Sequence, residues 1–307
     1  MIAEKLKISL DDKYLLKNGF AFMTGIQALV RLPLVQRLID LKSGYNTAGY
    51  ISGYRGSPLG AYDQQLTLNQ KLLEENHIKF QPGVNEDLAA TALWGTQQAE
   101  LRGEGKYDGI FGIWYGKGPG IDRSGDVLRH ANFAGTSKFG GVLAIMGDDH
   151  TCESSTTCHQ SELAMVDAMI PILNPSGVQE IIDYGIIGLS LSRYSGCWVG
   201  LKCVHDTVES SASINVDIDR INIEIPQNSS IPADGLNIRL PDTPQDQEKR
   251  MHESKIDAVR TFCRKNKLDK IIWNGFKAKI GIISLGKSYL DTRLALDELG
   301  INESNVE

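Results

Sequence analysis

The chain has 307 residues, of which 41% are hydrophobic and 23% charged, an ordinary globular composition with length for one large domain or two modest ones. A net charge of −6 without a Lys/Arg-rich block argues against a nucleic-acid partner. The N-terminus has no apolar signal-peptide core and no apolar run could span a bilayer, so we expect neither secretion nor a membrane partner.

Short apolar runs alternate along the chain with longer, helix-like stretches. Because several runs are continuously apolar, they are typical of strands buried in a parallel sheet. The intervening segments are long enough for crossover helices. We therefore predict an α/β fold: an open, mostly parallel sheet with helices on both faces. The strands are expected at Thr47–Ile51, Ile78–Phe80, Gly109–Trp114, Val142–Met146, Ile170–Leu173 and Cys197–Val204.

Three helices are predicted between these strands. One covers about Gly25–Leu41, with Pro33 marking a kink or a late start. A second, Asp87–Leu101, is rich in small residues and should pack closely on the sheet. The third, Gly177–Tyr194, has its apolar residues on one face and follows a capping-box pattern of a serine and a glutamine.

The sequence changes character after Ser213. Residues Val216–Ile225 alternate between apolar and polar, which predicts a half-exposed strand. We assign residues 1–225 to the first domain. Residues 226–270 are expected to form a proline-rich connector with a helix from Asp246 to about Lys267.

Residues 271–307 then predict the start of a second α/β domain. An apolar strand is expected at Lys279–Leu285 and a helix at Tyr289–Leu299. Since a lone strand and helix cannot bury their apolar faces, we expect this second domain to be truncated.

The cysteines indicate a reducing environment. They are odd in number and contain no C-x-x-C motif, so we predict reduced thiols in a cytoplasmic protein and no iron–sulfur ligand run in this chain. They are Cys152, Cys158, Cys197, Cys203 and Cys263.

Four stretches that could bind a ligand each follow a predicted strand, and ligands of open parallel sheets bind at the carboxyl ends of strands. The first stretch, residues 53–60, is glycine-rich. It is either a loop that approaches a ligand closely or a tight strand-to-helix turn, and it matches neither a dinucleotide nor a P-loop motif. Its candidate residues are Gly53, Tyr54, Gly56, Ser57 and Pro58.

The second stretch is Val84–Asp87. Composition favours a simple helix start, in which Asn85 caps the helix and the acidic residues Glu86 and Asp87 favour its positive end. The alternative is that Glu86 is a buried carboxylate at a strand end, aimed into a cleft.

The third stretch, residues 147–155, contributes the candidates Asp148, Asp149, Ser154 and Ser155. Its Asp, His and Cys residues fit no common zinc spacing, so we expect an active-site loop without a metal. The fourth stretch, Trp114–Arg129, contains Lys117 and Arg123. These cations suit an anionic ligand such as a carboxylate, although a solvated surface loop explains them equally well.

Together the stretches resemble the indolepyruvate:ferredoxin oxidoreductases, most closely the N-terminal part of the long fused bacterial form. GYRGSPLG is similar to the family's G-Y-P-G-T-P-S loop, and VNEDLAATALWGTQQAEL to its N-E-x-x-A segment. GDDHTCESST resembles its D-D-x-x-x-x-S-S loop, and IPILNPSGVQEIIDYG its P-x-x-x-P-S-x-x-Q-E segment. The resemblance covers about residues 10–213 and, more weakly, 279–300.

The resemblance implies a thiamine diphosphate-binding fold whose pyrimidine domain lies in this chain. Glu86 matches the family's glutamate that hydrogen-bonds the pyrimidine ring; a carboxyl in a dry pocket can share a proton with the ring. Ser57 stands where the family has threonine. Arg55 stands where it has proline, which leaves the shape of the loop and the substrate preference open.

The implied reaction is oxidative decarboxylation of a 2-oxoacid, indolepyruvate or another aryl pyruvate, to acyl-CoA, CO₂ and reduced ferredoxin. The chain contains no G-D-G motif for Mg²⁺ and diphosphate. Mg²⁺, an iron–sulfur cluster and the remaining domains are therefore expected from outside this chain, in a homo-oligomer such as a dimer. We expect no turnover from this piece alone. A nucleotide-binding α/β oxidoreductase domain and a non-catalytic assembly subunit remain alternatives.

Overall fold

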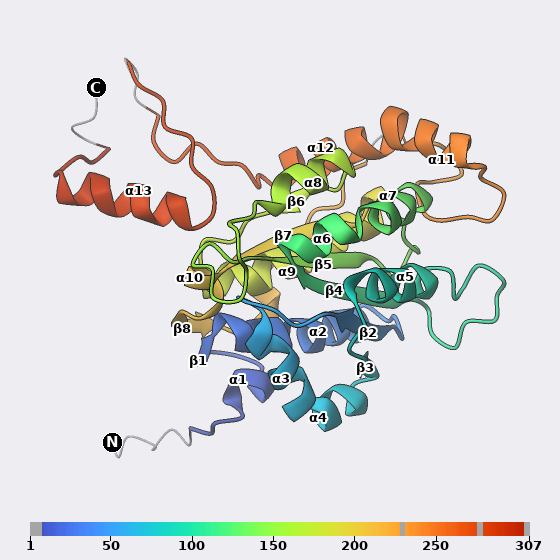
Figure 1. The fold of residues 1–307 in the computed structure, drawn as a ribbon, viewed down its shortest axis with the longest axis horizontal. Helices are drawn as coiled ribbons and strands as arrows, with labels where there is room; N and C mark the ends of the chain where they lie inside the picture. Colours follow the sequence, from blue (N-terminus) through green and yellow to red (C-terminus); the bar gives the residue numbers. More distant parts are fainter. Residues whose placement is uncertain (1–7, 228–230, 275–278, 304–307) are drawn as a thin grey trace.

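A six-stranded sheet forms the centre of the protein in the computed structural model, which describes residues 8–227, 231–274 and 279–303 (Figure 1). The strand order is β3-β2-β4-β5-β7-β6, and every neighbouring pair is parallel. The predicted fold class is confirmed, and all six predicted strands are present, one with the predicted bounds and five with shifted ends. They are β2 (Ala48–Gly53), β3 (Ile78–Phe80), β4 (Ile110–Lys117), β5 (Val142–Asp148), β6 (Ile172–Leu173) and β7 (Val199–Val204).

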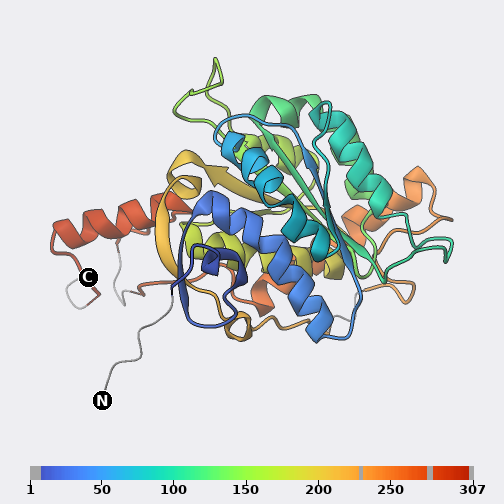
Figure 2. The ribbon, with the colours of Figure 1, turned by 90° about the horizontal axis from the view of Figure 1, so that it is seen from below.

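Helices cover both faces of this sheet, and each face has its own apolar core. Seen from below in Figure 2, α2 lies in front of the sheet. One face is covered by α2 (Gly25–Lys42), α3 (Gly60–Leu68), α4 (Gln70–Glu75) and α9 (Val178–Ser195). The other is covered by α5 (Glu86–Thr96), α6 (Gly118–Arg123), α7 (Gly125–Ala134) and α8 (Ser161–Asp167).

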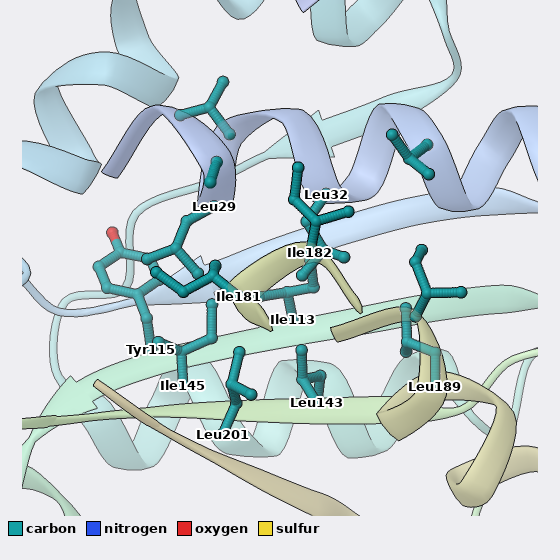
Figure 3. Close-up of a cluster of buried hydrophobic side chains, with 14 of the residues drawn as sticks. Leu29, Leu32, Ile113, Tyr115, Leu143, Ile145, Ile181, Ile182, Leu189 and Leu201 are labelled. Carbon is teal, nitrogen blue, oxygen red and sulfur yellow. The ribbon is translucent and has the colours of Figure 1, made fainter. Parts of the chain in front are cut away.

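The larger core lies between α2, α9 and the sheet. Figure 3 shows Leu29 and Leu32 of α2 directed toward Ile181 and Ile182 of α9, above the strands. The two helices approach closely at Gly185, where a Cβ atom would lie 2.5 Å from Cδ1 of Leu32. The burial of these side chains fixes α2 and α9 on the sheet.

Local details of the helices differ from the predictions. α2 continues on both sides of Pro33, so the proline does not delay its start. The capping box expected before α9 does not form, because the Ser176 amide and hydroxyl both donate to Oε2 of Glu180. α5 ends at Thr96, earlier than predicted; beyond it, the buried Gln97 side chain accepts from the amides of Ser137 and Gly141.

A small antiparallel ribbon was not predicted. It pairs β1 (Phe20–Thr24) with β8 (Ser211–Asn215), two segments that are distant in the sequence. The strand predicted at Val216–Ile225 is wrong, since only a 3₁₀ turn, Ile218–Arg220, forms there. The pairing with β1 ends where the Val216 amide donates to Gly19, so the following residues have no partner strand in this ribbon.

The helix predicted in the connector is confirmed, as α11 (Pro244–Arg250), a π-helical turn (Met251–Lys255) and α12 (Ile256–Lys265). α12 buries Phe262 in the core beside α9. Two further short helices are α1 (Asp12–Leu15) and α10 (His205–Val208).

The structure does not contain the strand predicted at Lys279–Leu285, and this prediction is wrong. An apolar run becomes a strand only by pairing, and no described strand lies beside it. The helix predicted after it is confirmed as α13 (Lys287–Glu298), which buries none of its residues and lies apart from the sheet in Figure 1. No helix in the described ranges is both long and apolar enough to cross a membrane.

Candidate active site

The four candidate stretches meet at the carboxyl ends of the parallel strands. β2 lies between β3 and β4 in the sheet. After β2 the chain forms β3 on one side of it, and β4 then lies on the opposite side, followed by the remaining strands. The stretches after β2 and β4 therefore flank the point where the strand order reverses. In open α/β sheets this point forms a natural crevice for ligands.

Ser154 joins three of the stretches. The Ser57 amide donates to its Oγ at 3.0 Å, and Lys117 Nζ donates to its carbonyl oxygen at 3.0 Å. The Ser57 hydroxyl donates to Oε2 of the neighbouring Glu153, also at 3.0 Å. The loop after β5 thus contacts both the glycine-rich turn after β2 and the end of β4.

Residues 53–60 form a tight turn between β2 and α3. The Gly53 carbonyl accepts from the Gly83 amide at 2.8 Å, which attaches this turn to the stretch before α5. Tyr54 keeps its ring partly exposed, and its amide donates to Tyr115 at 3.1 Å. The peptide bond between Ser57 and Pro58 is cis.

Glu86 is the first residue of α5 and is only 7% exposed. The helix-start interpretation of its neighbour is confirmed, because Asn85 Oδ1 accepts from the Leu88 amide at 2.9 Å. The backbone carbonyl of Glu86 accepts a hydrogen bond from the indole N–H of Trp114 at 3.1 Å. Within the described ranges, no residue donates a hydrogen bond to the Glu86 carboxylate and no cation pairs with it.

The Glu86 side chain lies against the backbone of two glycines, Gly116 and Gly120. A Cβ atom at Gly120 would be 2.5 Å from Oε1 of Glu86, and one at Gly116 would be 3.4 Å from its Cγ. The Glu86 side chain is therefore held close to α6 and the end of β4, while its carboxylate oxygens reach solvent and keep open hydrogen-bonding capacity. Such carboxylate oxygens at the carboxyl end of a sheet can accept a hydrogen bond from a ligand or from water.

Asp149 shapes the loop after β5. Its carboxylate accepts from the amides of Glu153, Ser154 and Ser155 at 3.0–3.1 Å. Burial by itself raises the pKa of Asp149, but these hydrogen bonds outweigh it and hold the pKa below its ordinary value. Asp149 and the Ser155 amide thus organise the loop and present Ser154.

Asp148 does not line the loop surface, contrary to expectation. It is fully buried and accepts from the amide of Ser161, with Lys202 Nζ 3.4 Å from its Oδ2. Lys202 also pairs with Glu162. Burial raises the pKa of Glu162, but the hydrogen bond and charge of Lys202, together with further hydrogen bonds, hold it below its ordinary value. Sequence reasoning missed Lys202, although a lone lysine inside an apolar strand was a usable signal.

The fourth stretch consists of the end of β4 followed by α6 and the start of α7, and is not a loop. Lys117 ends β4, and Arg123 ends α6 with its Nε 3.5 Å from Oδ2 of Asp87. His159, which was not predicted, places Nε2 2.7 Å from Asp122 in the same helix. Lys117 therefore lies beside the loop that contains Ser154, and Arg123 lies beside the stretch that contains Glu86.

One group could offer three ligand atoms to a metal ion. Glu153, His205 and Glu209 place these atoms within 4.8 Å of one another, at or near the surface. His205 Nε2 is 3.0 Å from a carboxylate oxygen of each glutamate, which also describes two ion pairs of a protonated histidine. Sequence spacing could not reveal the group, because Glu153 and α10 belong to different segments.

A comparison with family sequence models matches residues 270–307 to the indolepyruvate oxidoreductase domain. Among solved structures, a 2-oxoglutarate:ferredoxin oxidoreductase from Magnetococcus marinus, with 2-oxoglutarate, coenzyme A and succinyl-CoA bound, has a similar fold. The TM-score is 0.66 at 15% sequence identity, covering 93% of this chain. The chain spans 52% of that protein. The comparison with curated protein sequences gave no significant match.

Proposed function

We propose that this chain, which the two matches support as a member of the 2-oxoacid:ferredoxin oxidoreductase family, holds the aminopyrimidine of thiamine diphosphate. The observation that carries the proposal is Glu86: a residue that is only 7% exposed, lies at the carboxyl end of the sheet and has a carboxylate without a donor among the described residues.

The residues around Glu86 fit such a group. Gly116 and Gly120 leave the carboxylate room at the end of β4, and the turn at Gly53 closes the neighbouring side. Trp114 donates to the Glu86 backbone and so holds the start of α5 in position. An aromatic, hydrogen-bonding ring would give the carboxylate the partner that it lacks.

In this proposal Glu86 hydrogen-bonds the ring and holds a proton between its carboxyl oxygen and a ring nitrogen. Bound thiamine diphosphate supplies the electron sink for decarboxylation of a 2-oxoacid. Lys117, 3.0 Å from the Ser154 carbonyl, keeps a positive charge near the substrate carboxylate, and Ser57 supplies a polar contact.

The finer parts of the proposal rest on the resemblance of the motifs. The substrate is indolepyruvate or another aryl pyruvate, and the products are acyl-CoA, CO₂ and reduced ferredoxin. Mg²⁺, the diphosphate anchor and the iron–sulfur cluster come from other parts of the enzyme, in a homo-oligomer. The chain spans about half of its structural relative, which leaves room for them elsewhere.

Glu86→Gln in the full-length protein tests the proposal. We expect 2-oxoacid-dependent dye reduction with thiamine diphosphate, Mg²⁺ and CoA to fall by about 100-fold or more, since the amide cannot share the proton. The circular dichroism and the melting temperature should stay unchanged. Glu104→Gln, at an exposed position, is the matched control and should retain activity.

Retention of near wild-type activity by Glu86→Gln would contradict the proposal. It would favour a nucleotide-binding oxidoreductase domain or a non-catalytic subunit, in which Glu86 only starts a helix. The ratio of kcat/KM for indolepyruvate to that for 2-oxoglutarate decides the substrate class separately.

A further inference from the structure

Two exposed thiols face each other on the loop between β5 and α8. The Sγ atoms of Cys152 and Cys158 are 3.8 Å apart, and both residues are exposed. The chain's other cysteines differ clearly: Cys197 and Cys203 are fully buried, and Cys263 is partly buried. Cys152 and Cys158 therefore form the accessible pair, which neither the proposed function nor the sequence motifs use.

We propose that Cys152 and Cys158 are a reversible oxidation site that closes to an intramolecular disulfide when a peroxide or a small-molecule disulfide is present. Each thiol loses one hydrogen, and the two sulfurs form one bond. The two electrons and two protons pass to the oxidant: hydrogen peroxide becomes two waters, and a small disulfide becomes two thiols.

Disulfide formation requires only a short movement. The sulfur atoms would have to approach from 3.8 Å to about 2.05 Å, the length of a disulfide bond. One side of the pair is already fixed, because the Cys152 amide donates to the Asp149 carbonyl at 3.1 Å and the next three amides bind the Asp149 carboxylate. Closure therefore needs adjustment mainly on the side of Cys158.

The rate of closure should increase with pH, since the thiolate is the reactive form. The hydrogen bond with Cys158 raises the pKa of Cys152, with smaller contributions from burial and from the charge of Asp149. Oxidation at neutral pH is consequently expected to be slower than at pH 9.

The segment between the two cysteines contacts the candidate active site. Glu153 accepts from the Ser57 hydroxyl, and Ser154 contacts both Ser57 and Lys117. A disulfide across this segment would restrict the loop that joins the turn after β2 to the end of β4. Oxidation state and loop position are therefore coupled, whether or not the site binds a cofactor.

The 307-residue chain allows a direct test, because Glu153 lies between the two cysteines. The reduced chain is treated with oxidised glutathione or hydrogen peroxide, denatured, alkylated and digested with a protease that cleaves after glutamate. Peptides 105–153 and 154–162 should remain linked without reductant and separate after reduction. Two thiols per chain should escape alkylation, and reductant should restore both.

Matched variants identify the pair. Cys152→Ser and Cys158→Ser should each prevent the linkage, whereas Cys263→Ser should leave it unchanged; circular dichroism checks that all three variants fold. Glutathione adducts without linkage, disulfides between chains, linkage through another cysteine, or full alkylation of both thiols would each overturn the proposal.

Discussion

The Glu86 side chain lies directly against Gly120 in the candidate site. The carboxylate occupies the space where a side chain at position 120 would lie, 2.5 Å from Oε1 and 2.6 Å from Cγ. Within the described ranges the Glu86 carboxylate has no hydrogen-bond donor, since the Trp114 indole donates to the backbone carbonyl. Its position therefore depends on packing against backbone rather than on a polar partner, and a single methyl group should be enough to displace it.

Gly120→Ala should move the Glu86 carboxylate while leaving the fold intact, because the displaced atoms belong to a flexible side chain. We expect the proposed activity of the full-length protein to fall at least 10-fold, with a loss of stability below about 2 kcal/mol. Gly125→Ala is the control. The Cβ atom that it adds would lie 3.7 Å from its nearest neighbour, Nη1 of Arg129, which is an ordinary van der Waals distance. Equal activities of the two variants would argue against a role for the position of Glu86.

Helices α7 and α9 end beside one another. Lys255, the last residue of the π-helical turn Met251–Lys255, connects both helix ends to that turn. Its Nζ donates to the carbonyls of Asn132, Phe133 and Gly196 at 3.0–3.3 Å, and the side chain is fully buried. The ammonium thus satisfies carbonyls that a helix leaves unpaired at its C-terminus. Burial lowers the pKa of Lys255 to about 8.

Lys255→Met should lower the free energy of unfolding by about 1–3 kcal/mol at pH 7, because buried carbonyls lose their donor. In the wild-type protein the folded state binds fewer protons than the unfolded state between pH 8 and 10.5. Its stability therefore gains about 2 kcal/mol from Lys255 between pH 7.5 and 9.5, and the variant lacks this gain.

Urea unfolding of both proteins at pH 7.5 and 9.5 measures this difference, and other titrating groups cancel between them. Lys265→Met, at a half-exposed lysine paired with Glu224, serves as the control and should show no comparable pH dependence. A stability difference that stays constant with pH would mean that Lys255 keeps its ordinary pKa in the fold.

The whole molecule consists of a well-packed sheet domain and a C-terminal segment with little burial. α12 still contributes Phe262 to the core, whereas α13 buries no residue. Several large apolar side chains after α12 are exposed, with Ile283 at 95%. Such exposure is typical of a surface that another segment or subunit covers.

Limited proteolysis should therefore cut the chain between Leu268 and Gly286 well before it cuts the sheet domain. Removing α13 should shift the melting temperature by less than about 3 °C, because little apolar area leaves the core. Mass spectrometry locates the cut, and calorimetry of the trimmed protein measures the shift. An early cut within β4 or β5, or a large loss of stability, would contradict this division.

The sequence by itself determined which segments form the central sheet, but not the exact ends of most strands. Buried parallel strands are continuously apolar over a few residues, and that signal is local. Since the candidate stretches follow such strands, the placement of Ser57, Glu86 and Lys117 at the carboxyl end of the sheet could also be predicted. The segment Lys279–Leu285 shows the limit: it has the apolar pattern of a strand, but a strand also needs a partner.

Only the tertiary structure decided which of these residues meet. The pairing of β1 with β8, the contacts of Ser154 and the salt bridges of Lys202 all join segments that are distant in the chain. Sequence pattern also could not decide which of the adjacent residues Asp148 and Asp149 shapes the loop. That depends on the direction of each side chain, which packing sets.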